Sequence, residues 1–329
     1  MALSDLAVFS EWAYSGFQET LGYNVTLFNA ASDGTIVLRQ QSHTGDYSEE
    51  AFWKRIDNLV RRRNAYGNAT LSEVSLEMLT DVMVKVAGGT PPVNVSPSQF
   101  EWIRRNPEEG GALYGRQLAG DMVRDMVETG IMAFIAATIA EDAVYFDGAD
   151  EFLNWKHFNQ GQALFGDRSA AIRVWIMHSA PLFGLWGSNL VNAEQLFDFG
   201  GIRVVADPFG RPLVITDSPS LVELNGVEPD TYYTLGLTTA AIVVDQNDDF
   251  HSNVEESNGK ENIQRTIQSE WSFNLGLKGY AWDKTNGGKS PNDAALAVST
   301  NWDRIATSHK DLGGVIIETQ AGDPSGVNA

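Results

Sequence analysis

The residues that could carry chemistry are histidines, nucleophiles and glycine-rich stretches, and their spacing decides what they can do. No two of the five histidines lie four residues apart, so none forms the i, i+4 pair that places two imidazoles on one metal ion. The chain has neither a G-x-S-x-G elbow nor a G-x-G-x-x-G loop. The stretch NGGKS at 286–290 resembles the end of a phosphate-binding loop, but Asp283 stands where the first glycine belongs. We therefore predict no catalytic residue, no cofactor and no enzyme activity.

Residues 245–256, DQNDDFHSNVEE, have the oxygen spacing of a calcium-binding loop. The oxygens would come from Asp245, Asn247, Asp249, Asn253 and Glu256. However, Phe250 occupies the position where the sharp turn needs glycine, and a strand pattern precedes the stretch where a helix should be. We interpret the segment as a polar surface loop and predict no metal site, with a weak cation site as the alternative.

A third candidate is the basic run Arg61-Arg62-Arg63 in NLVRRRNAYGN, residues 58–68. Such a run can bind phosphate, contact an acidic protein surface or simply be solvated. The chain carries 43 acidic and 23 basic residues, a formal net charge of −20, which repels nucleic acid as a whole. We favour a contact with an acidic patch on another copy of the chain and keep the other two interpretations as alternatives.

Composition sets the class of protein. A chain of 329 residues with 43% hydrophobic and 20% charged residues is a folded globular protein of one large or two ordinary domains. The absence of cysteine excludes disulfides and thiolate zinc sites. The first 16 residues lack the basic start of a secretory signal, and the longest apolar run, 129–140, is too short to cross a bilayer. We expect a soluble protein with no membrane partner.

The elements that would position these residues begin with helical patterns. Residues 1–31 combine weak helical spacing with many aromatic side chains, among them Trp12 and Phe17, and predict an apolar arm that needs a packing surface. A short strand pattern at 35–38, a polar run and the three arginines indicate a protruding hairpin or loop over 32–70.

Three further helices are predicted between residues 70 and 140. The first begins at a capping box of Thr70 and Glu73 and ends at Gly88-Gly89, with an apolar pattern of Val74, Met78, Val82 and Val86. A short second helix begins at Ser96. The strongest signal is the third, with Asn106 as N-cap, Pro107 at the first position and an apolar stripe to about residue 140. About 34 residues make a helix of roughly 50 Å.

The second half of the chain has short strand patterns separated by turn residues. We predict strands at 171–178 and 238–245, a hairpin at 201–216, and a half-buried strand at 266–277 with strict alternation of polar and apolar residues. The fold class is therefore α+β with a single long helix.

Four stretches of the sequence resemble a known family. They are MALSDLAVFSEWAYSGFQETLGYNVTLFNAASDGTIVL, GDYSEEAFWKRIDNLVRRRNAYG, VKVAGGTPPV and NDAALAVSTNWDRIATSHKDLGGVIIETQ. Together they are similar to the major capsid proteins of tailed double-stranded DNA phages, nearest to the epsilon-fifteen type, which have the Hong Kong 97 fold. The resemblance is distributed over nearly the whole chain and assigns no single residue.

The resemblance implies a specific division of the chain. The expected parts are an N-terminal arm at 1–31, an extended loop at 32–72, a peripheral domain at 73–159 and 291–329 with a spine helix at about 107–140, and a β-rich axial domain at 160–290. A final strand near 315–319 would return to the peripheral sheet.

The resemblance also implies the function. Identical subunits would associate as pentamers and hexamers into an icosahedral shell around packaged double-stranded DNA, assembled in the host cytoplasm. Arg61, Arg62, Arg63, Trp12 and Phe17 are then expected to contact sister subunits. Helical structure is expected almost from Met1, so we expect a separate scaffold protein, with portal and decoration proteins and non-specific contact with DNA. The alternatives are an encapsulin-like nanocompartment shell and a calcium-binding or hydrolytic β protein.

Overall fold

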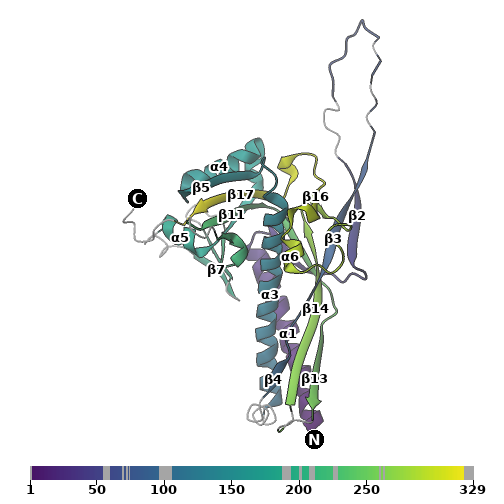
Figure 1. Ribbon diagram of the computed structural model, residues 1–329, viewed down its shortest axis with the longest axis vertical. Coiled ribbons are helices and arrows are strands. Elements are labelled where there is room, and N and C mark those ends of the chain that lie inside the picture. Colours follow the sequence, from purple (N-terminus) through teal and green to yellow (C-terminus); the bar gives the residue numbers. More distant parts are fainter. Residues whose placement is uncertain are drawn as a thin grey trace.

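The computed structural model describes residues 2–54, 60–68, 70–71, 73, 75–95, 106–186, 194–199, 202–206, 212–224, 229–258, 261 and 264–321. In this part of the chain two long helices and two mixed sheets form an elongated body, and one hairpin protrudes from it (Figure 1). None of the described helices is long and apolar enough to cross a membrane. The α+β class predicted from the sequence is confirmed, but the prediction of a single long helix is wrong, because residues 2–31 also form a long helix.

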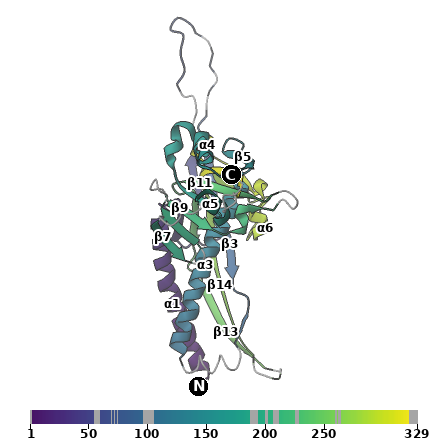
Figure 2. The same ribbon diagram turned by 90° about the vertical axis from the view of Figure 1, so that its left-hand side faces the viewer.

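The two long helices, α1 (Ala2–Ala31) and α3 (Pro107–Thr138), lie side by side in both views of the molecule (Figures 1 and 2). The bounds of α3 confirm the predicted long helix. Pro107 begins it and acidic residues occupy the first turn, but the Asn106 side chain does not cap it and instead donates a hydrogen bond to Glu109 Oε2 at 3.2 Å. The last third of α3 is buried almost all round because both sheets cover it.

The first sheet has nine strands. Its main path is β1 (Ile36–Gln40), β12 (Ile242–Gln246), β14 (Gln264–Leu277), β15 (Tyr280–Trp282) and β16 (Trp302–Arg304). The long strand β14 also pairs with β3 (Met78–Gly89), β4 (Val93–Val95) and β13 (His251–Ser257), and β2 (Tyr47–Trp53) pairs with β3. The alternating pattern at 266–277 therefore does form a strand, as predicted, and this strand organises the sheet.

The predicted helix between Thr70 and Gly89 is wrong. Thr70 and Glu73 are not helical, and residues 78–89 form β3, in which Val82, Val84 and Val86 are buried on one face. A spacing of four residues fits a strand, with its period of two, as well as a helix. Strand β2 pairs with residues 78–84 of β3 and β14 pairs with residues 84–89, and the valines of β3 favour a strand. The second predicted helix, at Ser96, lies outside the described residues.

The second sheet has eight strands. Its path is β5 (Tyr145–Phe152), β17 (Gly314–Gln320), β11 (Thr231–Thr238), β6 (Ile172–Met177), β9 (Pro212–Thr216), β8 (Ile202–Ala206) and β7 (Glu194–Phe199), with β10 (Val222–Glu223) beside β11. The predicted strand at 171–178 and the predicted hairpin at 201–216 are present as β6 and as β8 with β9. The remaining elements are α4 (Trp155–Phe165), α5 (Ser179–Trp186), α6 (Asp293–Leu296), and the 3-10 turns η1 (Gly166–Ala171), η3 (Pro219–Leu221), η4 (Ser299–Asn301) and η5 (His309–Asp311).

Each of the two sheets combines strands from distant parts of the sequence. The predicted axial domain covers residues 160–290. The strands between residues 242 and 282 belong to the first sheet, which also contains β2 and β3. The final strand exists as β17, but it pairs with β11 and β5 in the second sheet, which also holds β6, β8 and β9. The protruding hairpin runs from β2 to β3, so its second strand lies beyond residue 72.

Candidate assembly surfaces

Helix α1 is held against α3 by glycines that remove side chains from the contact. A Cβ atom on Gly115 would lie 2.1 Å from the carbonyl oxygen of Ala13, and one on Gly111 would lie 2.4 Å from that of Phe9. On α1, a Cβ on Gly16 would lie 3.1 Å from Ala112. The two backbones can approach this closely only because these positions lack side chains. The sequence analysis missed this contact, although glycines four residues apart within a helical pattern indicate one.

The two aromatic residues predicted as assembly contacts lie on opposite sides of α1. Phe17 is fully buried within its own chain and stacks on Phe250, with ring centroids 4.4 Å apart. It therefore anchors α1 to the body and presents no surface to a neighbour. Trp12 is 43% exposed and shares the outward side of the helix with Tyr23 and Leu27. We call these three residues the outer face of α1.

The three arginines lie on the segment that protrudes furthest from the body. Beyond the last pair of the β2–β3 ladder, Trp53 with Met78, the chain leaves the sheet and runs far past the end of the body (Figures 1 and 2). Residues 60–68, which we call the loop tip, contain Arg61, Arg62 and Arg63, and all are exposed. None of the three forms an ion pair with the described residues. The loop tip thus offers three free guanidinium groups together with Tyr66, whose side chain contacts almost nothing.

Ion pairs hold the base of this hairpin. Lys54 bonds Glu77 across the hairpin at 2.7 Å, and the hydrogen bond lowers the pKa of Glu77. Lys289 bonds Asp46 at 2.8 Å and lowers its pKa in the same way, and Lys284 pairs with Glu49. Each pair is exposed to solvent and therefore stabilises little by itself. Together, however, they connect the hairpin to residues 284–289 and restrict the direction in which it leaves the body.

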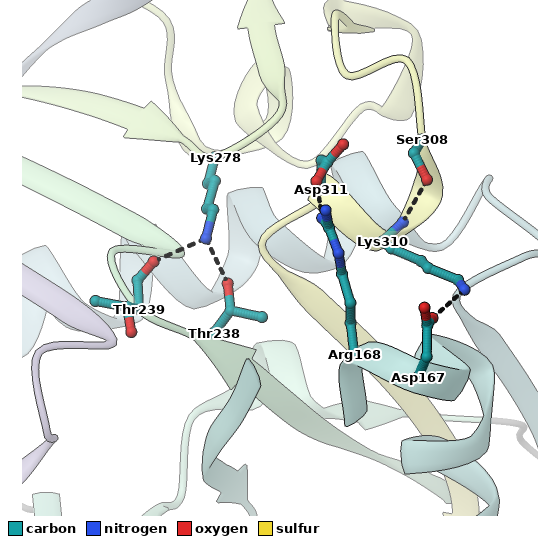
Figure 3. Close-up of polar contacts among 8 residues, drawn as sticks. All are labelled: Asp167, Arg168, Thr238, Thr239, Lys278, Ser308, Lys310 and Asp311. Atoms are coloured by element: carbon teal, nitrogen blue, oxygen red, sulfur yellow. Dashed lines mark hydrogen bonds and ion pairs between the residues drawn. The ribbon is translucent and has the colours of Figure 1, made fainter. Parts of the chain in front are cut away.

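A polar joint links the two sheets (Figure 3). Lys278, in the turn between β14 and β15, donates from Nζ to Thr238 Oγ1 at 3.0 Å and to the carbonyl oxygen of Thr239 at 3.1 Å, at the end of β11. Burial lowers the pKa of Lys278. Beside it, η1 and η5 are joined by two ion pairs, Arg168 with Asp311 and Lys310 with Asp167. The joint fixes the second sheet relative to the first.

The histidines lie in separate environments. His157 is buried, with Nε2 2.9 Å from Glu151 Oε2, and its Nδ1 accepts a hydrogen bond from the backbone of Asn154 in the capping box of α4. His178 faces Asp217 at 3.6 Å, and burial lowers its pKa. Among the described residues, no group of three histidine, cysteine or acidic side chains could hold a metal ion. These histidines have structural partners that explain their positions.

The oxygens of the calcium-like stretch do not converge. Asp245 receives two hydrogen bonds from Arg39, at 2.7 and 3.0 Å, while Asp249 receives one from the backbone of Ser272 at 2.9 Å. Asn253 and Glu256 lie on the extended strand β13, which cannot curl around an ion. The geometry therefore does not favour a cation site, and the predicted surface loop is wrong over most of the stretch, because Asp245 lies in β12 and residues 251–256 lie in β13.

Comparison with known proteins gives a consistent result. The family model Gp13-like, described as major capsid protein 13-like, matches residues 5–316. The fold is similar to the capsid of Ralstonia phage GP4, with 13% identity, a TM-score of 0.50 and 89% of each chain covered. It is also similar to the capsid asymmetric unit of cyanophage Pam1, with 10% identity, a TM-score of 0.52, and 86% of this chain and 89% of that chain covered. A search of curated proteins found no match.

Proposed function

Because the chain belongs to the Gp13-like family of major capsid proteins, we propose that its copies close an icosahedral shell through two surfaces, the loop tip and the outer face of α1. The Hong Kong 97-like α+β fold expected from the sequence is the fold of this capsid protein. The protein is a structural component of the virion capsid, and we propose that it catalyses no reaction.

The observation that carries the choice of surfaces is the protruding hairpin. Its tip lies away from the body, so its residues cannot stabilise their own subunit, and Val60 and Tyr66 expose at least 90% of their surface, at 91% and 101%. Large exposed apolar side chains next to unpaired cations are typical of a surface that another protein covers. In a closed shell each subunit can donate one loop and receive another, as heterologous contacts require.

We also propose how the chain divides into the parts of a capsid subunit. We propose α1 as the N-terminal arm over 1–31, the extended loop as the protruding part of 32–72 continued into β3, and α3 as the spine of the peripheral domain. Residues 160–290 supply most of the axial domain, with β5 and β17 completing its sheet. Pentamers and hexamers would then form around the axial parts.

We propose further partners from the net charge and the family of the chain. The net charge of −20 favours a lining that contacts packaged DNA non-specifically and without tight binding. We propose a separate scaffold protein, a portal and decoration proteins, and assembly in the cytoplasm of the host. The family match favours a phage shell over an encapsulin-like nanocompartment.

The test is the size of the purified protein under assembly conditions. Size-exclusion chromatography with electron microscopy should show closed particles of many subunits. A persistent folded monomer would contradict the proposed shell. A particle that retains an enzyme cargo and no DNA would favour the nanocompartment.

A further inference from the structure

A polar pocket of about 510 Å³ opens where α1 crosses the ends of β1 and β12. Its lining contains hydroxyl, amide and carboxylate groups and no cationic side chain: Tyr14, Gln18, Gln40, Ser42, Gln246, Asn247 and Asp248. A pocket that contains hydrogen-bond acceptors and lacks cations suits a cationic donor.

Two acceptors in this pocket have no partner among the described residues. Gln246 is only 6% exposed, and its side-chain oxygen Oε1 is buried without a hydrogen bond. A buried acceptor without a hydrogen bond destabilises the folded chain, so a donor that reached it would be favoured.

The second acceptor is the carboxylate of Asp248. Its neighbours in the same turn are already engaged, because Asp245 is bonded by Arg39 and Asp249 by Ser272 and by Lys85 at 3.5 Å. Asp248 is exposed and forms no ion pair or hydrogen bond with the described residues. The free carboxylate of Asp248 and the side chain of Gln246, whose buried oxygen lacks a hydrogen bond, therefore belong to the same pocket lining.

This set of groups fits a guanidinium better than an ammonium. A guanidinium is planar and carries several donors in a fixed fork, so one arginine can bond the Asp248 carboxylate and still offer donors to the amide groups of the lining. Tyr14 forms a further wall of the pocket and is 46% exposed, and an aromatic face attracts a guanidinium that stacks on it.

We propose that this pocket receives an arginine of the run Arg61–Arg63 from a second copy of the chain. The proposal rests on the proposed self-assembly and identifies the receiving site of the loop tip. The subunit's own loop tip extends beyond the end of the body opposite to the N-terminal end of α1 (Figure 1), whereas the pocket lies at the middle of α1, where Tyr14 and Gln18 line it. The same chain carries both the exposed arginines of the loop tip and the pocket with unpaired acceptors, so a second copy of the chain is a sufficient partner.

Disulfide trapping tests the contact directly, since the natural chain has no cysteine. The double variant Arg62→Cys with Asp248→Cys should give, after mild oxidation of purified particles, a ladder of covalent multimers on non-reducing gels that collapses with reductant. The matched control pairs Arg62→Cys with Asp142→Cys, an exposed aspartate outside the pocket. Particles without a ladder, or an equal ladder from the control, would overturn the proposal.

Charge reversal provides a second measurement that does not depend on oxidation. Asp248→Arg should lower the assembled fraction at least tenfold, and the combination with Arg61→Glu, Arg62→Glu and Arg63→Glu should restore part of it. Asp142→Arg should leave assembly unchanged. If the natural chain forms particles and Asp248→Arg does so equally well, the pocket assignment is wrong while the shell function stands. If the natural chain forms no particles even when it is produced together with the proposed scaffold protein, the shell function itself is wrong.

Discussion

Glu50 and Asp81 face each other directly across the β2–β3 ladder at the base of the protruding hairpin. Burial raises the pKa of Asp81 to about 6, and the negative charge of Glu50 is the second cause. The Oδ1 atom of Asp81 forms no hydrogen bond with the described residues. The cleft beside Asp81, about 490 Å³, is also lined by Lys54, Lys278 and Asp311. Like charges directly opposite in a sheet are destabilising. The base of the hairpin is therefore strained at neutral pH.

The pH dependence of this strain has a definite sign. The pKa of Asp81 is higher in the folded chain, at about 6, than its ordinary value of 3.8, so the folded state binds the proton more tightly. The destabilisation is fully present above pH 6 and is relieved as the pH falls from 6 towards 4. Asp81→Asn should raise the free energy of unfolding by about 1 kcal/mol at pH 8 and by almost nothing at pH 4. Thermal unfolding at both pH values measures this, and an equal gain at both would contradict it.

Replacement of Gly115 tests the close contact between the two long helices. Gly115→Ala places a methyl group against the carbonyl of Ala13, so the helices must move apart, and we expect a loss of about 1–3 kcal/mol or more. Gly22→Ala is the matched control, because a Cβ there meets nothing within 4 Å and alanine favours a helix by up to about 1 kcal/mol. Chemical denaturation of the two variants should give shifts of opposite sign. Shifts of the same sign would mean that the helix contact is looser than the structure shows.

Substitutions of Phe17 and Trp12 should have different effects, the first on the stability of the subunit and the second on its assembly into particles. Phe17→Ala removes a fully buried ring and should cost about 3–5 kcal/mol of stability. Trp12→Ser changes a residue that is 43% exposed, so it should cost less stability than Phe17→Ala, while the assembled fraction falls. Unfolding curves and particle yields, measured together, test both statements. A Trp12→Ser variant that assembles normally would remove Trp12 from the outer-face contact.

The arginine run should matter for protein contacts and not for nucleic acid. Replacing Arg61, Arg62 and Arg63 with serine should lower the assembled fraction about tenfold or more, which corresponds to about 1.4 kcal/mol. The DNA content of the particles that still form should not change. Sedimentation of particles with ultraviolet absorbance measures both quantities. Normal assembly with lost DNA would instead support the phosphate-binding interpretation.

The stability of the contact between the two sheets should depend on the side chain of Lys278. Lys278→Met keeps the length of the side chain but loses the bonds to Thr238 and Thr239, which are worth about 1 kcal/mol each. We expect a lower unfolding temperature. Lys156→Met, on the exposed start of α4, serves as a control and should have no such effect.

Several features could be predicted from the sequence because short-range interactions fix them. Pro107 and the acidic first turn of α3 act within a few residues, and the polar–apolar alternation of β14 predicts a strand wherever that strand lies. The distributed resemblance to capsid proteins, supported by the family match, also required no coordinates. The exposed arginine run was found in the same way, from its composition alone.

Only the tertiary structure decided which elements meet. The valines of β3 fit a helix or a strand equally until β2 and β14 provided partners, and β17 could have paired in either sheet. Trp12 and Phe17 are five residues apart on one helix, and only the position of Phe250 shows which of them is buried. The pocket around Gln246 is built from three segments distant in sequence. The periodicity of a segment is local, but burial and pairing depend on partners that the segment itself does not encode.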